Sequence, residues 1–354
     1  MGQIRVGTVG FSYRDWVGVF YPQGAPSRRQ LGIYCEKFDV CELTQFTHQM
    51  PDVDRINHFT SQIKTDVRML VRIHNTFTHC ADIAMALSMA RYFRKAIEPL
   101  YDAQKFAGFV APFPYAFKNT PERRDYIREL AAALGFMGLP LQLDFRHPSW
   151  ATPSALRWIS ENKLGFVCVD EPSLPGLVPP LSLATSDRVV VRFHGRNAEA
   201  WWSGNATTRH DYCYSQDELV DMVERYLPLV HQASEVCFLF QNHWQAQSVR
   251  NALQWKNLVT EAAEDRRTTP TIIPVSNSIV EQDELINELE VPEVSVPTEP
   301  EQSEEVPSLD DDLTRPPAML SLSEVKMRVS REFSSLQAAL DLPPRAADIT
   351  PHAE

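Results

Sequence analysis

The 354-residue sequence has no closely spaced cysteine pair and no apolar run that approaches the length of a membrane span. Its six cysteines form no CxxC motif, and several lie inside apolar runs, which is typical of buried free thiols in a reducing compartment. The N-terminal stretch MGQIRVGTVG carries no apolar signal core. We therefore expect a cytoplasmic protein that does not enter the membrane.

Several catalytic signatures are also missing. The sequence contains no HExxH zinc motif, no GxSxG nucleophile elbow and no phosphate-binding P-loop. No lysine stands at the end of a predicted strand, which argues against Schiff-base catalysis. Any activity must therefore come from residues that are dispersed along the chain and brought together by the fold.

The net charge of −12 is concentrated in the C-terminal part of the chain. Residues 261–354 hold 21 acidic and 7 basic residues, whereas residues 1–260 hold 25 and 27. From about residue 268 the composition is rich in Pro and Glu, and it cannot bury enough apolar surface to offset the entropy of ordering. We predict a folded domain over 1–262 and an acidic, mostly disordered tail over 263–354. A helical spacing near 320–340 could bind a protein partner.

Within the first 260 residues, short apolar strands alternate with helical segments. The predicted strands are 4–7, 40–43, 68–73, 106–111, 139–145, 165–169, 189–193 and 236–240. Eight strands alternating with helices over this length favour a (β/α)8 TIM barrel, with a doubly wound open sheet as the rival architecture. Pro112 and Pro114 should break the fourth strand, Ser215 should cap the helix over 216–232, and Pro228 should kink or end it.

Ionisable side chains follow nearly every predicted strand. In parallel α/β folds the carboxyl ends of the strands meet at one face, and ligands bind there. The candidate catalytic residues are Glu42, Asp170, His194 and His243, which could act by acid–base chemistry or hold a divalent metal such as Mn, Zn or Mg. The candidate substrate-binding residues are Arg72, His79, Asp144, Arg146, His147, Arg196, Asn197, Trp201, Tyr212 and Asn242. The arginines are suited to phosphate or carboxylate, so we expect an anionic small molecule or a nucleic acid as ligand.

Each of these residues also has a structural interpretation. A histidine at a strand end is often hydrogen-bonded within the fold, Asp144 and Arg146 could form an ion pair, and Trp201 could pack beneath a loop. Three functions therefore stay open. The first is a hydrolase acting on a phosphate-bearing substrate, the second is a ligand-binding or adaptor protein that uses its acidic tail, and the third is a sugar-phosphate isomerase or epimerase.

Several long segments of residues 3–260 resemble the YecE-like family, a widespread prokaryotic domain of unknown function. They include GTVGFSYRDWVGVFYP (7–22), DFRHPSW (144–150), VDEPSLPGLVPP (169–180), VRFHGRN (191–197) and QNHWQAQSVRNA (241–252). The resemblance implies a TIM barrel without implying an activity. This sequence departs from the family pattern at Arg72, Pro112, Asp144, His210 and Gln241, where the family tends to have Lys, Gln, Glu, Tyr and Asn. The acidic tail is not part of the family pattern.

Overall fold

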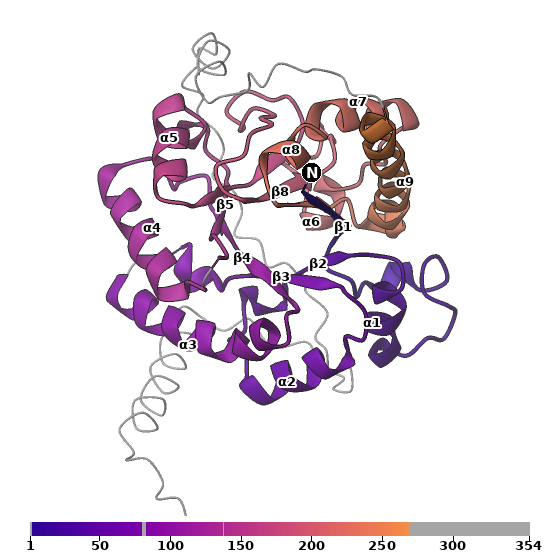
Figure 1. Ribbon diagram of the computed structural model, residues 1–354, viewed down its shortest axis with the longest axis horizontal. Coiled ribbons are helices and arrows are strands. Elements are labelled where there is room, and N and C mark those ends of the chain that lie inside the picture. Colours follow the sequence, from indigo (N-terminus) through magenta and orange to yellow (C-terminus); the bar gives the residue numbers. More distant parts are fainter. Residues whose placement is uncertain (1, 80–82, 137, 269–354) are drawn as a thin grey trace, which may run out of the picture. The chain divides into compact units, whose positions relative to one another are not determined.

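A computed structural model describes residues 2–79, 83–136 and 138–268 (Figure 1). The strands are β1 (Gln3–Val9), β2 (Val40–Leu43), β3 (Arg68–Arg72), β4 (Phe106–Phe113), β5 (Gln142–Phe145), β6 (Gly165–Phe166), β7 (Cys168–Asp170), β8 (Arg188–Phe193) and β9 (Glu235–Phe240). The helices are α1 (Ser27–Cys35), α2 (Val53–Gln62), α3 (Ile83–Asp102), α4 (Pro121–Leu134), α5 (Pro153–Glu161), α6 (Ala206–Arg209), α7 (Gln216–Tyr226), α8 (Leu229–Gln232) and α9 (Gln247–Thr268). The predicted tail beyond 268, with its helix near 320–340, lies outside the described residues.

All the strands are parallel and belong to one sheet, in the order β6-β5-β4-β3-β2-β1-β9-β8-β7. Only Val167 separates β6 from β7, and its backbone N–H still donates to the carbonyl of Leu143 in β5. Because β6 pairs with β5 and β7 pairs with β8, the two are halves of one interrupted strand that closes the ring. The predicted TIM barrel is confirmed, and helices surround the strands (Figure 1).

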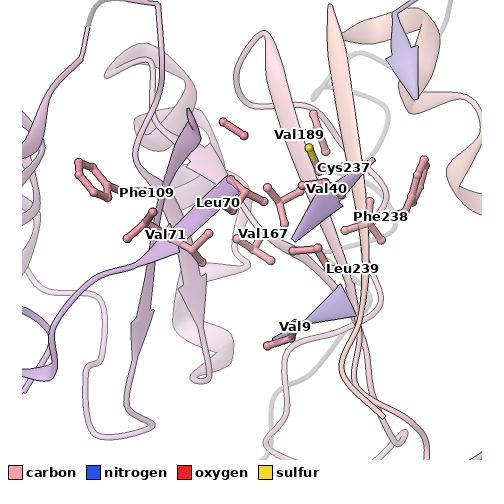
Figure 2. Close-up of a cluster of buried hydrophobic side chains, with 14 of the residues drawn as sticks. Val9, Val40, Leu70, Val71, Phe109, Val167, Val189, Cys237, Phe238 and Leu239 are labelled. Carbon is pink, nitrogen blue, oxygen red and sulfur yellow. The ribbon is translucent and has the colours of Figure 1, made fainter. Parts of the chain in front are cut away.

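The interior of the barrel is apolar over most of its length. Figure 2 shows buried side chains from several strands lying together, among them Val9, Val40, Leu70, Val189 and Leu239. Every residue of β2, β5 and β9 is buried, including the polar residues Glu42, Gln142, Asp144 and Glu235. Charged residues within such strands must therefore find partners inside the barrel.

Two proline predictions had different outcomes. Pro228 does end a helix, because α7 stops at Tyr226 and α8 begins at Leu229, and Ser215 caps α7 through a capping box. The predicted break at Pro112 is wrong, since β4 runs through it to Phe113, whereas Pro114 directly follows the end of the strand, as predicted. The last residue pair between β3 and β4 is Arg72 with Val110, so Pro112 has only β5 beside it and its missing N–H interrupts no pairing with β3.

Buried ion pairs occur toward both ends of the barrel. Arg188, Val190 and Arg192 alternate along β8 and therefore share one face, with an apolar residue between the two arginines. Near the amino ends of the strands, Arg188 Nη1 contacts Glu235 Oε1 at 2.5 Å and Arg5 Nε contacts Glu235 Oε2 at 2.7 Å. Arg5 Nη2 also lies 3.3 Å from Asp66 Oδ2. Arg68 Nε lies 3.5 Å from Asp66 Oδ1. We call Arg5, Asp66, Arg68, Arg188 and Glu235 the amino-end cluster.

None of the helices in the described part of the chain combines the length and the apolar character that crossing a membrane requires. The described cysteines agree with the expected thiols, since Cys35, Cys41, Cys168 and Cys237 are buried and unpaired, while Cys213 is exposed. Helix α9 continues to Thr268, past the boundary at 262 that the composition indicated.

Candidate functional site at the carboxyl end of the barrel

Arg192 of β8 is the centre of the polar group at the carboxyl end of the barrel. Its side chain is fully buried, with Nη2 lying 2.5 Å from Glu42 Oε2 and Nη1 lying 2.5 Å from Asp144 Oδ2. Glu42 is in β2 and Asp144 is in β5, and neither strand neighbours β8 in the sheet. The guanidinium therefore reaches across the barrel interior and joins three strands that do not pair.

A second arginine completes the coordination of Glu42. Arg72, the last residue of β3, donates from Nε to Glu42 Oε1 at 2.8 Å, so both carboxylate oxygens of Glu42 face guanidinium groups. Burial by itself would raise the pKa of Asp144, but the positive charges of Arg146 and Arg192 outweigh burial and lower it. Asp144 is therefore ionised at neutral pH.

Arg146 is the member of this group that reaches solvent, with 22% of its side chain exposed. Its Nη2 lies 3.7 Å from Asp144 Oδ2, and its Nη1 lies 3.9 Å from Glu171 Oε2. Nη1 is also 3.0 Å from His194 Nε2. Because a guanidinium only donates, His194 accepts at Nε2 and carries its proton on Nδ1.

Glu171 and His194 are both buried in uncharged forms. Burial raises the pKa of Glu171 to about 8, so this carboxyl is mostly protonated at neutral pH. Burial, aided by the charge of Arg146, lowers the pKa of His194 well below its usual value. We call the seven residues Glu42, Arg72, Asp144, Arg146, Glu171, Arg192 and His194 the carboxyl-end cluster.

Several atoms in and beside this cluster are buried without a hydrogen-bond partner among the described residues. They are Asp144 Oδ1, Glu171 Oε2, His194 Nδ1 and, on the adjoining strand end, Gln241 Oε1 and Asn242 Oδ1. Buried polar atoms are nearly always hydrogen-bonded in folded proteins, and several exceptions in one place need an explanation. The group offers both donors and acceptors to a molecule that would enter there.

Arg196 and Asp170 form a separate network beside the cluster. Arg196 pairs with both oxygens of Asp170, at 2.8 Å from Nε and 2.7 Å from Nη2, and its Nη1 lies 3.0 Å from Glu218. Tyr214 donates to Asp170 at 2.9 Å, and Tyr212 donates to Glu218 at 2.6 Å. These contacts engage Arg196 with two carboxylates, so a role in positioning the loop after β8 suits it better than the predicted role in clamping an anion.

The histidines after β8 and β9 lie close together but differ in their surroundings. His194 and His210 are nearly parallel, with ring centroids 5.6 Å apart. His243 is partly exposed and stacks on Tyr13 at 4.7 Å. His210 donates from Nδ1 to the carbonyl oxygen of His194, at 2.8 Å. Of the two predicted catalytic histidines, His194 therefore lies in the cluster and His243 lies at its edge.

The remaining predicted residues serve the surrounding loops. His147 accepts from the backbone of Ser149 and caps a short turn, and His79 is exposed beside Thr78. Asn197 and Asn242 donate to backbone carbonyls. Trp201 is buried and meets His194 edge-on, which agrees with its structural interpretation as a residue packed beneath a loop.

The proposed metal ligands do not fit a divalent cation. Both oxygens of Glu42 and both oxygens of Asp170 face arginines, and His194 Nε2 faces Arg146. A cation at any of these atoms would meet a guanidinium charge. Nowhere in the described ranges do three His, Cys, Asp or Glu side chains gather as a metal-binding group.

Sequence reasoning missed three of the residues that matter here. Glu171 directly follows Asp170 at a strand end, but it was not among the predicted site residues. The signal for it was the presence of two consecutive acidic residues after an apolar strand. Gln241 was noted only as a departure from a family pattern. Arg192 is inside an apolar strand, and a buried arginine in such a strand is itself a signal, because its charge requires partners within the barrel.

The fold and the site define a TIM-barrel protein with an arginine-rich polar cluster at the carboxyl end of its strands. The chain belongs to the family described as "Protein of unknown function DUF72", whose model matches residues 5–274. YecE-like is an older name for this family, so the resemblance seen in the sequence is confirmed at the family level.

Relatives of known structure match the barrel region. A DUF72 family protein from Thermotoga maritima is 30% identical, with a TM-score of 0.66, and the match covers 73% of this chain and 99% of that one. A DUF72 family protein from Enterococcus faecalis is 25% identical, with a TM-score of 0.65, over 73% of this chain and 96% of that one. The UPF0759 protein YunF of Bacillus subtilis is 25% identical over an alignment of 272 residues, and the match covers 72% of this chain and 94% of YunF.

Proposed function

We propose that this protein binds a phosphate-bearing substrate at Arg146 and hydrolyses it by acid–base catalysis. The observation that carries this proposal is that the pKa values of Asp144 and Glu171, two carboxyl groups beside the guanidinium of Arg146, are shifted in opposite directions. The pKa of Asp144 is lowered, while burial raises the pKa of Glu171 to about 8. Such a divergence is how one active site supplies a base and an acid at the same pH.

The charge of the cluster supports an anionic substrate. It holds three guanidinium groups beside the carboxyl groups of Glu42 and Asp144 and a Glu171 that is mostly protonated at neutral pH, so guanidinium groups outnumber the carboxyl groups that pair closely with them. Arg146 is partly exposed, whereas Arg72 and Arg192 are buried. A ligand from solvent would therefore meet Arg146 first, and a planar guanidinium suits two oxygens of a phosphate group.

The chemical step uses the unpaired atoms of the two acids. Asp144 takes a proton from a water molecule, whose oxygen forms a new bond to phosphorus. The bond from phosphorus to the leaving oxygen breaks, and Glu171 gives its proton to that oxygen. Arg146 balances the negative charge on the phosphate during the transfer.

Two other functions remain as alternatives to this proposal. The same acid and base could move a proton between neighbouring carbons of a sugar phosphate, which would make the protein an isomerase or epimerase. An adaptor protein would bind its ligand and convert nothing. The products formed from a panel of phosphate esters and sugar phosphates distinguish these three cases.

The test is the release of inorganic phosphate from glycerol 3-phosphate, whose alkoxide leaving group needs a proton, by the full chain and by Glu171→Gln. Glutamine imitates the protonated carboxyl but cannot give up a proton, so we expect kcat to fall at least ~100-fold with KM nearly unchanged. Glu129→Gln, on an exposed face of α4, is the matched control and should keep the wild-type rate. Hydrolysis that is equally fast in Glu171→Gln would contradict the proposal, as would turnover of sugar phosphates alone.

A further inference from the structure

We infer that the substrate carries a hydroxyl group next to its phosphate, as a polyol or sugar phosphate does, and that Gln241 Oε1 accepts the hydrogen bond of that hydroxyl. This inference rests on the proposed anion site at Arg146, and it adds a class of substrate and a residue that selects it. Gln241 directly follows β9 and is 6% exposed.

The direction of each hydrogen bond around Gln241 follows from its neighbours. His210 Nδ1 lies 2.8 Å from the carbonyl oxygen of His194, and a carbonyl only accepts, so Nδ1 carries the proton. Burial keeps His210 neutral by lowering its pKa, and Nε2 must then be an acceptor. Gln241 Nε2, at 3.2 Å, therefore donates to it. This fixes the orientation of the amide and leaves Oε1 as an acceptor.

Gln241 Oε1 is buried and has no hydrogen-bond partner in the described part of the chain. Leaving a buried acceptor unpaired costs about 1–3 kcal/mol, which a suitable ligand group recovers. An ionised phosphate oxygen cannot donate to it, and an ammonium group would be repelled by the guanidinium groups of the cluster. The group that fits is a neutral donor, and a hydroxyl is the smallest one.

The acceptor and the anion-binding arginine are linked through two stacked histidines. Gln241 bonds to His210, the ring of His210 lies 5.6 Å from that of His194, and His194 Nε2 lies 3.0 Å from Arg146 Nη1. One small molecule with a phosphate and a hydroxyl group can therefore use Arg146 and Gln241 together.

The experiment compares two ligands of equal chain length by isothermal titration calorimetry on the full chain. Glycerol 3-phosphate has two hydroxyls, n-propyl phosphate has none, and inorganic phosphate reports the anion site alone. We expect glycerol 3-phosphate to bind at least ~10-fold more tightly than propyl phosphate. In Gln241→Leu the preference should fall to within about twofold, because the acceptor is gone. Gln232→Leu, at the exposed last position of α8, is the matched control and should keep the preference.

The outcomes separate this inference from the proposal on which it rests. Equal affinity for the two esters in the wild type would overturn the hydroxyl inference and leave the anion site standing. A preference that survives in Gln241→Leu would overturn the role of Gln241. If none of the three ligands binds, the anion site and the hydroxyl inference fail together. The wild-type comparison decides the hydroxyl inference even if Gln241→Leu does not fold.

Discussion

The barrel holds two clusters of arginines and carboxyl groups, one at each end, and they differ in how completely the carboxyl oxygens are paired. In the amino-end cluster each oxygen of Glu235 and each oxygen of Asp66 faces a guanidinium group. In the carboxyl-end cluster Asp144 Oδ1 has no hydrogen-bond partner among the described residues, Glu171 is protonated and His194 is neutral. The carboxyl end therefore keeps hydrogen-bonding capacity that the amino end has already used.

This difference agrees with the proposal that the amino end stabilises the fold and the carboxyl end binds the ligand. Burial by itself would lower the pKa of Arg5, but Glu235 and Asp66 outweigh burial and raise it, so Arg5 stays charged inside the barrel. Beside Arg146, burial instead drives Glu171 and His194 into uncharged forms that can exchange a proton with a substrate. In TIM barrels the amino end generally serves stability and the carboxyl end serves chemistry.

The largest effect should come from removing the central arginine of the carboxyl-end cluster. Arg192→Met leaves Glu42 with one guanidinium and deprives Asp144 of its closest partner, so we expect a loss of about 3–5 kcal/mol in the free energy of unfolding. Denaturant unfolding measures this loss. Arg5→Met should cost less, about 2 kcal/mol, because Glu235 keeps Arg188. If the Arg192→Met variant were as stable as Arg5→Met, the expected difference between the two clusters would be contradicted.

Glu171 should make stability depend on pH in a predictable direction. Its pKa rises from 4.5 in the unfolded chain to about 8 in the folded protein, so the folded state holds the additional proton between these values. The stability contribution of Glu171 is therefore complete below about pH 4.5 and is lost as the pH rises toward 8. Between pH 5 and 8 the wild type should lose on the order of 3 kcal/mol relative to Glu171→Gln.

Unfolding curves of the wild type and Glu171→Gln, recorded in parallel at several pH values, test this prediction. Because the comparison is between two variants, the titration of histidines such as His194 cancels to first order. Parallel stability profiles for the two proteins would show that Glu171 is not buried in its neutral form, and its role as the acid would then fail.

The smallest effect should come from the exposed edge of the amino-end cluster. Asp66 pairs with Arg5, but 68% of the Asp66 side chain is exposed, and solvent screens the pair. Asp66→Asn should therefore lower the free energy of unfolding by less than about 0.5 kcal/mol, and by less still at high salt. Unfolding in low and high salt measures it. A loss above about 2 kcal/mol would show that the amino-end cluster depends on Asp66 far more than its exposure indicates.

The sequence predicted the architecture well because strands and helices leave local patterns. Seven strand positions were recognised from apolar runs, and the eighth, at 165–169, was recognised although Val167 interrupts it as β6 and β7. The extension of β4 through Pro112 could not be predicted, because it depends on where the neighbouring strand β3 ends.

The site was predicted only in part, because ion pairing between distant residues leaves no local pattern. Arg192 and Glu42 are 150 positions apart in the chain, and no spacing rule connects them. The sequence correctly placed polar residues at the strand ends, but it could not show that Arg196 is engaged by Asp170 and Glu218 while Arg146 reaches solvent. It also could not show the burial that raises the pKa of Glu171.

The most direct test of the account is a titration of inorganic phosphate into the full chain and two arginine variants, at pH 7. Arg146→Leu changes the exposed arginine of the carboxyl-end cluster, and Arg188→Leu changes a similarly exposed arginine of the amino-end cluster. We predict that Arg146→Leu weakens phosphate binding ~10–100-fold, whereas Arg188→Leu keeps the wild-type affinity in spite of lower stability. Equal affinity in the wild type and Arg146→Leu, or an equal loss in both variants, would contradict the assignment of ligand binding to the carboxyl end.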